Sequence, residues 1–329
     1  MLWYIPLEHI DMRYTIMQDR VTKKAFDDAG LEFKVVDGKI INSELASDQF
    51  LNPASTSYFK ATQMMKVAEL FNNNNIKNND IFYVSDVWFP GIESIKYMSM
   101  FKGINVKLYG PLYAGSFTPT DTVNSLTEWA RSFEHSLIKM FDGIFLGSEQ
   151  LKQDLIKSFT LNYGNLRKLY VTGYAFDSTE FDKYDVTKKE NIVVFPHRLH
   201  PEKQRDLFDN LKKHINAEFV VTHDLNLSKD EYYKLLAKAK VIYSASLQEN
   251  FGYSVLEGCM LGVAPVLPFN NYTCYKYMYP KEVLYENFND SVKLINKYLN
   301  ESIDLKHIPR YYDKAIDRQV EIIKNDRIR

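Results

Sequence analysis

Short apolar runs that read as strands alternate with helical patterns along most of the chain, and this alternation constrains the fold more than any other feature. In the first half, the strand-like runs lie at residues 2–6, 31–36, 80–85, 105–109, 143–146 and 169–172. Strands that alternate with helices form parallel sheets, because a parallel connection needs a crossover that a helix can supply. The sequence therefore predicts a parallel sheet with helices on both faces in the first half.

The pattern stops at residues 173–190, which are rich in Asp, Lys, Ser and Thr and have no periodicity. It then restarts, with strand-like runs at 191–195, 218–222, 241–244 and 264–267 and helical segments that include 201–214, 228–238 and 311–324. A chain of 329 residues is long enough for two ordinary domains. We therefore predict an α/β fold of two doubly wound (Rossmann-like) domains that face a cleft, at residues 1–174 and 175–310. A C-terminal helix at 311–329 is expected to pack back on the first domain.

The segment SASLQENFGYSVLEGCMLGVAPVLP, at 244–268, points to a ligand site. Two carboxylates, Glu249 and Glu257, flank seven residues that contain a Phe251-Gly252 turn and the start of a helix near Tyr253. The N-terminus of a helix attracts anions, because its first N–H groups lack partners and the helix dipole is positive there. The two carboxylates are placed to bind hydroxyls on either side of a bound phosphate, which suits a nucleotide-sugar.

A second segment, FPHRLHPEK at 195–203, follows the first strand of the second domain. Pro201 suits the first position of a helix. Arg198 and Lys203 therefore lie at a strand-to-helix turn, where their charges can meet a diphosphate. A solvated, basic helix start is the alternative interpretation.

The run ENFGYSVLE resembles the E-x7-E motif of retaining GT-B glycosyltransferases, and RL…EK resembles their G-R-L…E-K-G stretch. The resemblance implies the GT-B architecture. It implies that Glu257 binds the ribose and Glu249 the transferred sugar. It further implies that Arg198 and Lys203 neutralise the diphosphate leaving group, whose charge grows in the transition state. By this match Arg198, Lys203 and Glu249 are the catalytic candidates.

The same resemblance implies that the backbone at Phe251 and Gly252 faces the donor, with Asn250 and His197 beside it. His197 and Gln204 stand where the family often has Gly, so the backbone is expected to approach the donor less closely.

Three loops of the first domain, at 7–15, 85–92 and 110–121, are expected at the cleft. They are similar to glycosyltransferases encoded by tailed bacteriophages, which carry Y-I-P-L-E…R-Y-T, D-x-W-x-P-G-I-E and A-x-S…D segments. Where relatives often have His before A-x-S, this chain has Tyr113, so the resemblance transfers no His base. Capping, solvation or core packing is the alternative for each acceptor-side candidate. These candidates are Glu8, Asp11, Arg13, Asp86, Trp88, Tyr113, Ser116 and Asp121.

The composition limits the classes of partner that the protein is expected to bind. The formal net charge of −1 gives no general polyanion-binding surface, and no apolar run approaches the ~20 residues needed to span a bilayer. Neither a signal peptide nor a disulfide framework is expected from the polar start and the two cysteines, so a cytoplasmic location fits. The pattern formed by His197, His200 and His223 is weak for a metal site, and the chain has no Asp-x-Asp. We expect no metal, cofactor, membrane or obligate protein partner.

The sequence therefore predicts a retaining, metal-independent glycosyltransferase, a hexosyl- or pentosyltransferase, that uses a nucleotide-sugar donor. A hydroxymethylated base in phage DNA is one acceptor that fits, reached by base flipping and stacking on Trp88. The alternatives are a glycan or protein acceptor, a GT-B epimerase, and a non-catalytic protein that binds a nucleotide-sugar or nucleic acid.

Overall fold

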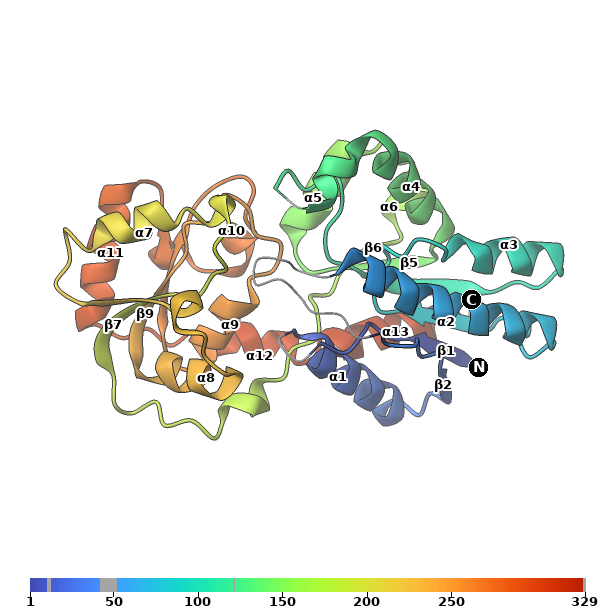
Figure 1. The fold of residues 1–329 in the computed structure, drawn as a ribbon, viewed down its shortest axis with the longest axis horizontal. Helices are drawn as coiled ribbons and strands as arrows, with labels where there is room; N and C mark the ends of the chain where they lie inside the picture. The colour runs from blue at the N-terminus through green and yellow to red at the C-terminus, as the bar shows by residue number, and fades with distance from the viewer. Residues whose placement is uncertain (11–12, 42–51, 121, 328–329) are drawn as a thin grey trace. The chain divides into compact units, whose positions relative to one another are not determined.

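The structure, a computed structural model, describes residues 1–10, 13–41, 52–120 and 122–327. Two of the acceptor-side candidates, Asp11 and Asp121, lie outside the described residues. The chain divides into two compact units (Figure 1). Unit 1 comprises Met1–Gly147, Leu151–Ala175 and Ala315–Arg329, and unit 2 comprises Ser148–Gln150 and Phe176–Lys314.

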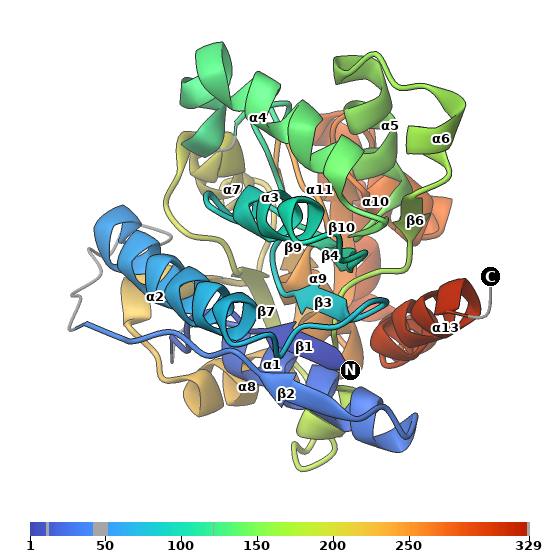
Figure 2. The same ribbon diagram turned by 90° about the vertical axis from the view of Figure 1, so that its right-hand side faces the viewer.

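Unit 1 is built on a six-stranded parallel sheet in the order β2-β1-β3-β4-β5-β6. Figure 2 shows α1 and α13 on one side of this sheet and α2 and α3 on the other. The strands are β1 (Leu2–Ile5), β2 (Phe33–Val35), β3 (Ile81–Val84), β4 (Lys107–Leu112), β5 (Gly143–Leu146) and β6 (Leu169–Val171). The helices, with one 3-10 turn, are α1 (Thr15–Asp28), α2 (Pro53–Asn72), α3 (Glu93–Phe101), η1 (Thr122–Leu126), α4 (Thr127–Met140), α5 (Glu149–Ser158), α6 (Tyr163–Leu166) and α13 (Ala315–Arg327).

Unit 2 is built on a five-stranded parallel sheet in the order β11-β10-β9-β7-β8. Its strands are β7 (Glu190–Phe195), β8 (Glu218–Val221), β9 (Ala239–Tyr243), β10 (Ala264–Pro268) and β11 (Leu284–Tyr285). Its α-helices are α7 (Arg205–Leu211), α8 (Lys229–Lys238), α9 (Tyr253–Met260), α10 (Tyr275–Met278), α11 (Phe288–Asn300) and α12 (His307–Tyr312). Its 3-10 turns are η2 (Ser178–Phe181), η3 (Pro201–Lys203), η4 (Thr222–Leu225) and η5 (Lys281–Val283). Two parallel, helix-covered sheets confirm the predicted fold class.

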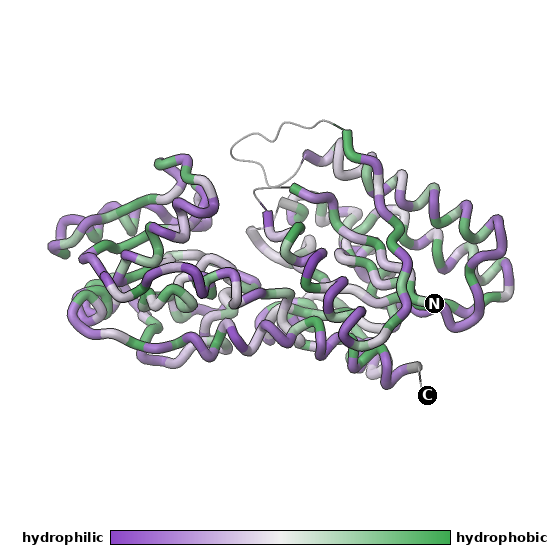
Figure 3. The backbone as a smooth tube through the Cα atoms, turned by 90° about the horizontal axis from the view of Figure 1, so that it is seen from below, coloured by the Kyte–Doolittle hydropathy of each residue, from purple (hydrophilic) through white to green (hydrophobic). Residues whose placement is uncertain are grey.

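The local sequence explains these elements. The central strands of unit 2 are continuous apolar runs because both faces of a parallel sheet are covered, and Val193, Ile242 and Val266 are fully buried. Helix α8 begins with a capping box, in which the Ser228 hydroxyl accepts from the Glu231 N–H while the Glu231 carboxylate accepts from the Ser228 N–H. Hydrophobic and hydrophilic residues alternate along the helices of both units (Figure 3), as expected of helices with one buried face. No helix in the described part of the chain is long and apolar enough to cross a membrane.

Two predicted helices are wrong in detail. The segment predicted as one helix at 201–214 is the short turn η3 followed by α7, because Gln204 between them has a left-handed backbone with φ 51°. The helix predicted at 311–324 is interrupted as well: α12 belongs to unit 2, whereas α13 belongs to unit 1 and packs against α1.

Candidate functional site

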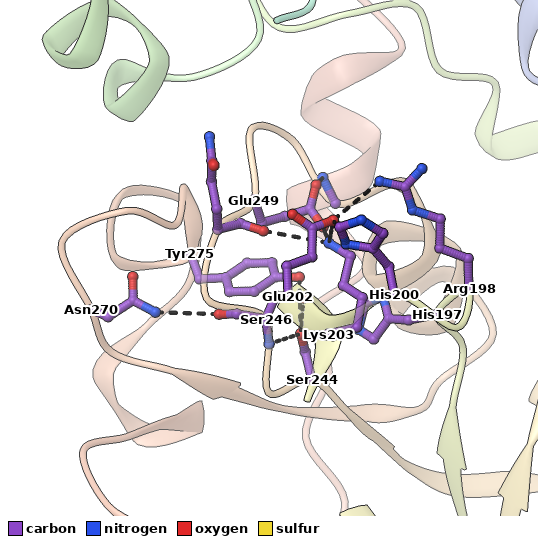
Figure 4. A network of polar contacts seen from close by, with 12 residues as sticks. His197, Arg198, His200, Glu202, Lys203, Ser244, Ser246, Glu249, Asn270 and Tyr275 are labelled. Atoms are coloured by element: carbon purple, nitrogen blue, oxygen red, sulfur yellow. Dashed lines mark hydrogen bonds and ion pairs between the residues drawn. The ribbon is translucent and has the colours of Figure 1, made fainter. Parts of the chain in front are cut away.

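The candidate site lies at the carboxyl edge of the unit 2 sheet, where the strand order reverses between β7 and β9. Ligands of open parallel sheets bind at such a reversal, because the loops after the two strands diverge and leave room between them. The loop after β7 carries residues 196–203, and the loop after β9 carries residues 244–252. Figure 4 shows that charged side chains from these two loops point toward one another.

Lys203 is the centre of this cluster. It ends the 3-10 turn that begins at Pro201, so its side chain points back toward the loop after β9. The Lys203 Nζ atom lies 3.1 Å from Oε2 of Glu249 and 3.4 Å from the backbone oxygen of Gln248. The ammonium is therefore held by residues that lie more than forty positions away in the sequence.

Glu202 holds the cations in place from the other side. Its Oε1 atom lies 3.2 Å from Nη2 of Arg198, 3.6 Å from Nζ of Lys203 and 3.7 Å from Nδ1 of His200. The Glu202 side chain is 8% exposed, whereas that of Arg198 is 35% exposed. A nearly buried carboxylate thus positions a partly exposed guanidinium, which is free to turn toward a ligand.

Glu249 is fixed through its backbone and through both carboxylate oxygens. Its N–H donates to the carbonyl of Tyr272 at 3.2 Å, and its carbonyl accepts from the N–H of Cys274 at 2.8 Å. Its Oε1 atom accepts from the N–H of Gly252 at 3.2 Å, while Oε2 faces Lys203. The carboxylate therefore joins the start of α9 to the cationic cluster.

Gly252 is the N-cap of α9 and has φ 75°, a conformation that L-residues with side chains adopt reluctantly. A Cβ atom there would also lie 3.0 Å from the Tyr275 ring. The ring of the preceding Phe251 is buried and packs edge-on against Tyr253 and Tyr312, with centroids 4.9 and 4.8 Å away. Phe251 therefore shapes the turn by packing its ring into unit 2. The carbonyl of the neighbouring Asn250 accepts from the Ser148 hydroxyl at 2.7 Å.

His197 lies beneath the cluster rather than in it. Its Nε2 atom is 3.0 Å from Oγ of Ser244, which in turn contacts Ser246 and Tyr275. Burial, together with the nearby charge of Lys203, holds the pKa of His197 well below its usual range, although Glu202 acts in the opposite direction. His197 is therefore neutral and serves as a hydrogen-bonding support for the floor of the site.

The described residues contain no group of three or more His, Cys, Asp or Glu side chains that could hold a metal ion. His200 lies beside Glu202, and His223 is exposed on η4.

Glu257 lies on α9, where its side chain is buried against α8. Its Oε1 atom accepts a hydrogen bond of 2.7 Å from the hydroxyl of Tyr233. Burial and the neighbouring Glu257 carboxylate raise the pKa of both Tyr232 and Tyr233. Glu257 is 3% exposed, so the carboxylate that the resemblance assigns to the ribose is almost completely shielded from solvent.

Sequence reasoning singled out Arg198, Lys203 and Glu249, and the structure brings these three together. It did not single out Glu202, although the four-residue spacing from Arg198 was a signal for an ion pair on one turn. It also missed Tyr233, whose contact with Glu257 joins separate helices and leaves no local pattern.

The acceptor-side candidates of unit 1 are spread over several loops, and most make hydrogen bonds within the unit. Glu8 is buried and accepts from the Thr56 hydroxyl at 3.0 Å. Asp86 accepts from Lys60 at 3.2 Å and from the Trp88 N–H at 3.0 Å. Arg13 is partly exposed at the start of α1.

A buried carboxylate, Glu134 of α4, ties two of these loops together. It accepts from the N–H and the hydroxyl of Ser116, both at 2.6 Å, and from Nε1 of Trp88 at 2.8 Å. Tyr113 packs on Tyr174, with ring centroids 4.5 Å apart, and the two line a small cavity with Gln319. Among the aromatic residues that contact Trp88, Trp129 is the most exposed, at 51%.

No protein-family model matches the chain. A stretch of 120 residues is 28% identical to the tRNA-queuosine alpha-mannosyltransferase of Drosophila melanogaster, and it spans 36% of this chain and only 29% of that protein.

Solved structures resemble the whole chain. HepE of Anabaena, in complex with UDP and glucose, matches with a TM-score of 0.62 at 11% identity over 99% of both chains. The lipopolysaccharide outer core galactosyltransferase WaaB matches with a TM-score of 0.62 at 12% identity over 99% of this chain and 98% of that one. The sucrose-phosphate synthase of Thermosynechococcus elongatus matches with a TM-score of 0.64 at 10% identity over 98% and 96%. The chain therefore has the fold of GT-B glycosyltransferases, with two Rossmann-like domains, as the sequence predicted.

Proposed function

We propose that this chain is a retaining glycosyltransferase that moves a sugar from a nucleotide-sugar to an acceptor. The observation that carries the proposal is the meeting of Arg198, Lys203 and Glu249 at the strand reversal of unit 2. Two cations beside a carboxylate suit a diphosphate joined to a hydroxyl-rich ring. The full-length fold match to a UDP-bound protein and to a galactosyltransferase supports the same substrate class.

In the proposed reaction, the bond between the anomeric carbon and the diphosphate oxygen breaks, and the acceptor hydroxyl oxygen bonds to that carbon on the same face. The acceptor proton passes to the departing phosphate oxygen. Arg198 and Lys203 stabilise the negative charge that accumulates on the diphosphate, and Glu249 orients the sugar. The two side-chain cations take the charge-neutralising role, so we propose that the reaction needs no metal ion.

For the acceptor, we propose a hydroxyl-bearing modified base in a nucleic acid. The relative from Drosophila is named for mannose transfer to queuosine in tRNA. The resemblance of the unit 1 loop sequences to phage glycosyltransferases makes a hydroxymethylated base in DNA a second acceptor of this class. The exposed ring of Trp129, whose centroid is 6.1 Å from that of Trp88, offers a stacking surface for a base.

The donor is tested with a panel of UDP-, GDP- and ADP-sugars in a thermal-shift assay, because a ligand at 100 times its Kd adds about 2.7 kcal/mol of stability. Slow hydrolysis of the stabilising donor separates an enzyme from a binding protein. Activity in excess chelator tests metal independence, and the anomeric configuration of the product, read by NMR, tests retention. An inverted product would overturn the retaining mechanism alone.

The acceptor is tested by transfer of labelled sugar to hydroxymethylated DNA, tRNA, a glycan and a protein. Trp129→Ala should lower transfer to the nucleic acid without changing donor hydrolysis. Trp88→Ala is a poorer test, because Trp88 also bonds to Glu134 and its loss should lower the melting temperature. Labelling confined to the glycan or protein would reject the nucleic-acid acceptor and leave the glycosyltransferase proposal intact.

A further inference from the structure

The ammonium group of Lys203 is already engaged by neighbouring protein groups. A lysine ammonium carries three N–H bonds, and three protein acceptors surround this one. They are the backbone oxygen of Gln248 at 3.4 Å and the carboxylates of Glu249 at 3.1 Å and Glu202 at 3.6 Å. The Lys203 side chain is only 11% exposed. Two of its N–H bonds are thus hydrogen-bonded to the loop after β9, and the Glu202 carboxylate lies at ion-pair distance. A phosphate oxygen that approaches this ammonium therefore competes with the carboxylates beside it.

Glu249 is the acceptor that can be replaced most easily. The Gln248 oxygen belongs to the backbone, and Glu202 is 8% exposed and also holds Arg198. The Glu249 side chain is 20% exposed, and a rotation about its side-chain bonds would move the carboxylate while the backbone stays in place.

The charges of the cluster give a reason for this exchange. Arg198 and Lys203 carry two positive charges, and Glu202 and Glu249 carry two negative ones. The group is thus formally neutral, and a diphosphate would bring an excess of negative charge into it. Movement of the Glu249 carboxylate away from Lys203 removes the repulsion nearest to the incoming phosphate.

Building on the function proposed above, we propose that Glu249 determines the preference of this site for an intact nucleotide-sugar over the free nucleoside diphosphate. Either ligand must displace the Glu249 carboxylate from Lys203. The nucleotide-sugar then offers that carboxylate its sugar hydroxyls as new hydrogen-bond donors. The free nucleoside diphosphate offers none, so Glu249 keeps only its bond to the Gly252 N–H among the described contacts.

The same exchange assists product release. Once the sugar has left, Glu249 has no sugar hydroxyl to bind, and it competes with the remaining diphosphate for Lys203. Re-formation of the 3.1 Å ion pair then favours departure of the nucleoside diphosphate. Glu249 would act twice in each cycle, first on the donor sugar and then on the leaving product.

The test is Glu249→Gln, which keeps the side-chain shape and an oxygen for the Gly252 N–H but removes the charge that pairs with Lys203. Titration calorimetry would compare UDP, GDP, inorganic pyrophosphate, UDP-glucose and GDP-mannose. We expect the variant to bind pyrophosphate and the matching diphosphate roughly tenfold more tightly, the effect of losing one charge-assisted pair. The affinity for the matching nucleotide-sugar should increase less. The dissociation constant of the diphosphate, divided by that of the nucleotide-sugar, should therefore be smaller in the variant than in the wild type.

Two variants control the experiment. In a Lys203→Met background, the substitution at Glu249 should no longer raise pyrophosphate affinity, because the competing ion pair is already absent. Glu301→Gln removes a carboxylate beside Lys297, 3.9 Å away on α11, and should leave every affinity unchanged. Melting temperatures would confirm that each variant is folded.

Different results separate this inference from the proposed function. If the wild type binds a nucleotide-sugar and Glu249→Gln binds the diphosphate no more tightly, the inference is wrong and the glycosyltransferase proposal stands. An equal gain in the Lys203→Met background would show a general charge effect and would also overturn it. If neither protein binds inorganic pyrophosphate or any member of the panel of UDP-, GDP- and ADP-sugars, the donor site itself is refuted, and the inference falls with it.

Discussion

Replacement of Tyr233 by Phe tests a hydrogen bond that joins α8 to the Glu257 carboxylate of α9. The bond is 2.7 Å long, and Tyr233 and Glu257 are 4% and 3% exposed, so water cannot replace the lost donor. Hydrogen bonds to charged groups contribute about 1.5–3 kcal/mol. Phenylalanine keeps the edge-on packing against Phe181, at 4.9 Å, so this loss should be the whole effect.

Scanning calorimetry can measure the change in unit 2 alone. The three tryptophans, Trp3, Trp88 and Trp129, all lie in unit 1, so their fluorescence identifies the transition of that unit. For a unit of roughly 140 residues, the expected loss lowers the melting temperature by about 5–10 °C. If Glu257 binds the ribose, as the resemblance implies, the same variant should also weaken nucleoside diphosphate binding, because the carboxylate loses a group that orients it.

Tyr285→Phe is the matched control. Its hydroxyl is also buried, but it donates to the neutral carbonyl of Ser244 at 2.9 Å, a bond expected to contribute only about 0.5–1.5 kcal/mol. A Tyr233→Phe variant that melts no lower than Tyr285→Phe would refute the reasoning. The Glu257 carboxylate would then be either uncharged or already supplied with enough other donors.

Three other changes have definite expected outcomes. Gln204→Gly should raise the free energy of unfolding of unit 2 by up to about 1 kcal/mol, measured by urea unfolding. A left-handed backbone costs a non-glycine residue ~1–2 kcal/mol, and the greater entropy of glycine in the unfolded state offsets ~0.5–1 kcal/mol of that gain. A destabilised variant would show that the Gln204 side chain matters more than its backbone. Arg198→Ala should lower kcat more than it raises KM, since leaving-group charge grows in the transition state, and a pure KM effect would contradict that role. Burial, aided by Lys306, lowers the pKa of Lys189 from 10.5 to about 8. Between these two values the unfolded chain binds more protons than the folded one, so stability should rise with pH across this range, and Lys189→Met should flatten that rise in melts from pH 8 to 10.5.

The strands were predictable because buried parallel strands appear in the sequence as continuous apolar runs. A parallel strand covered on both faces must be apolar throughout, and the runs at 143–146 and 264–267 correspond to β5 and β10. The break at Gln204 leaves no signal in the residue itself, since glutamine does not favour a left-handed backbone. The one hint was the Gly that the resembled family often has at this position. The break between α12 and α13 was hidden for another reason. Asp313, next to the break, accepts from the N–H and the hydroxyl of Ser178, a contact between residues far apart in sequence.

The charged residues of the candidate site in unit 2 were predictable from motif spacing, but their pairing was not. Lys203 and Glu249 are 46 positions apart, and only the parallel pairing of β7 with β9 brings their loops together. The same limit applies to Tyr233 and Glu257, which are 24 positions apart on neighbouring helices. Sequence patterns report what each segment buries, whereas the partner of a buried charge is set by the order of strands in the sheet.

The candidate loops of unit 1 differ from the candidate site of unit 2 in how their polar groups are paired. In unit 2 the charged groups pair with one another across loops and remain partly exposed, so an incoming ligand can exchange with them. In unit 1 the Ser116 hydroxyl and the indole Nε1–H of Trp88 both donate to the buried Glu134, which fixes the loops but leaves those groups little capacity for a substrate. Aromatic faces are then the main recognition surface that unit 1 offers beside these loops, with Trp129 the most exposed. This is why the polar residues of these loops carry less information about a ligand than the polar residues of unit 2 do.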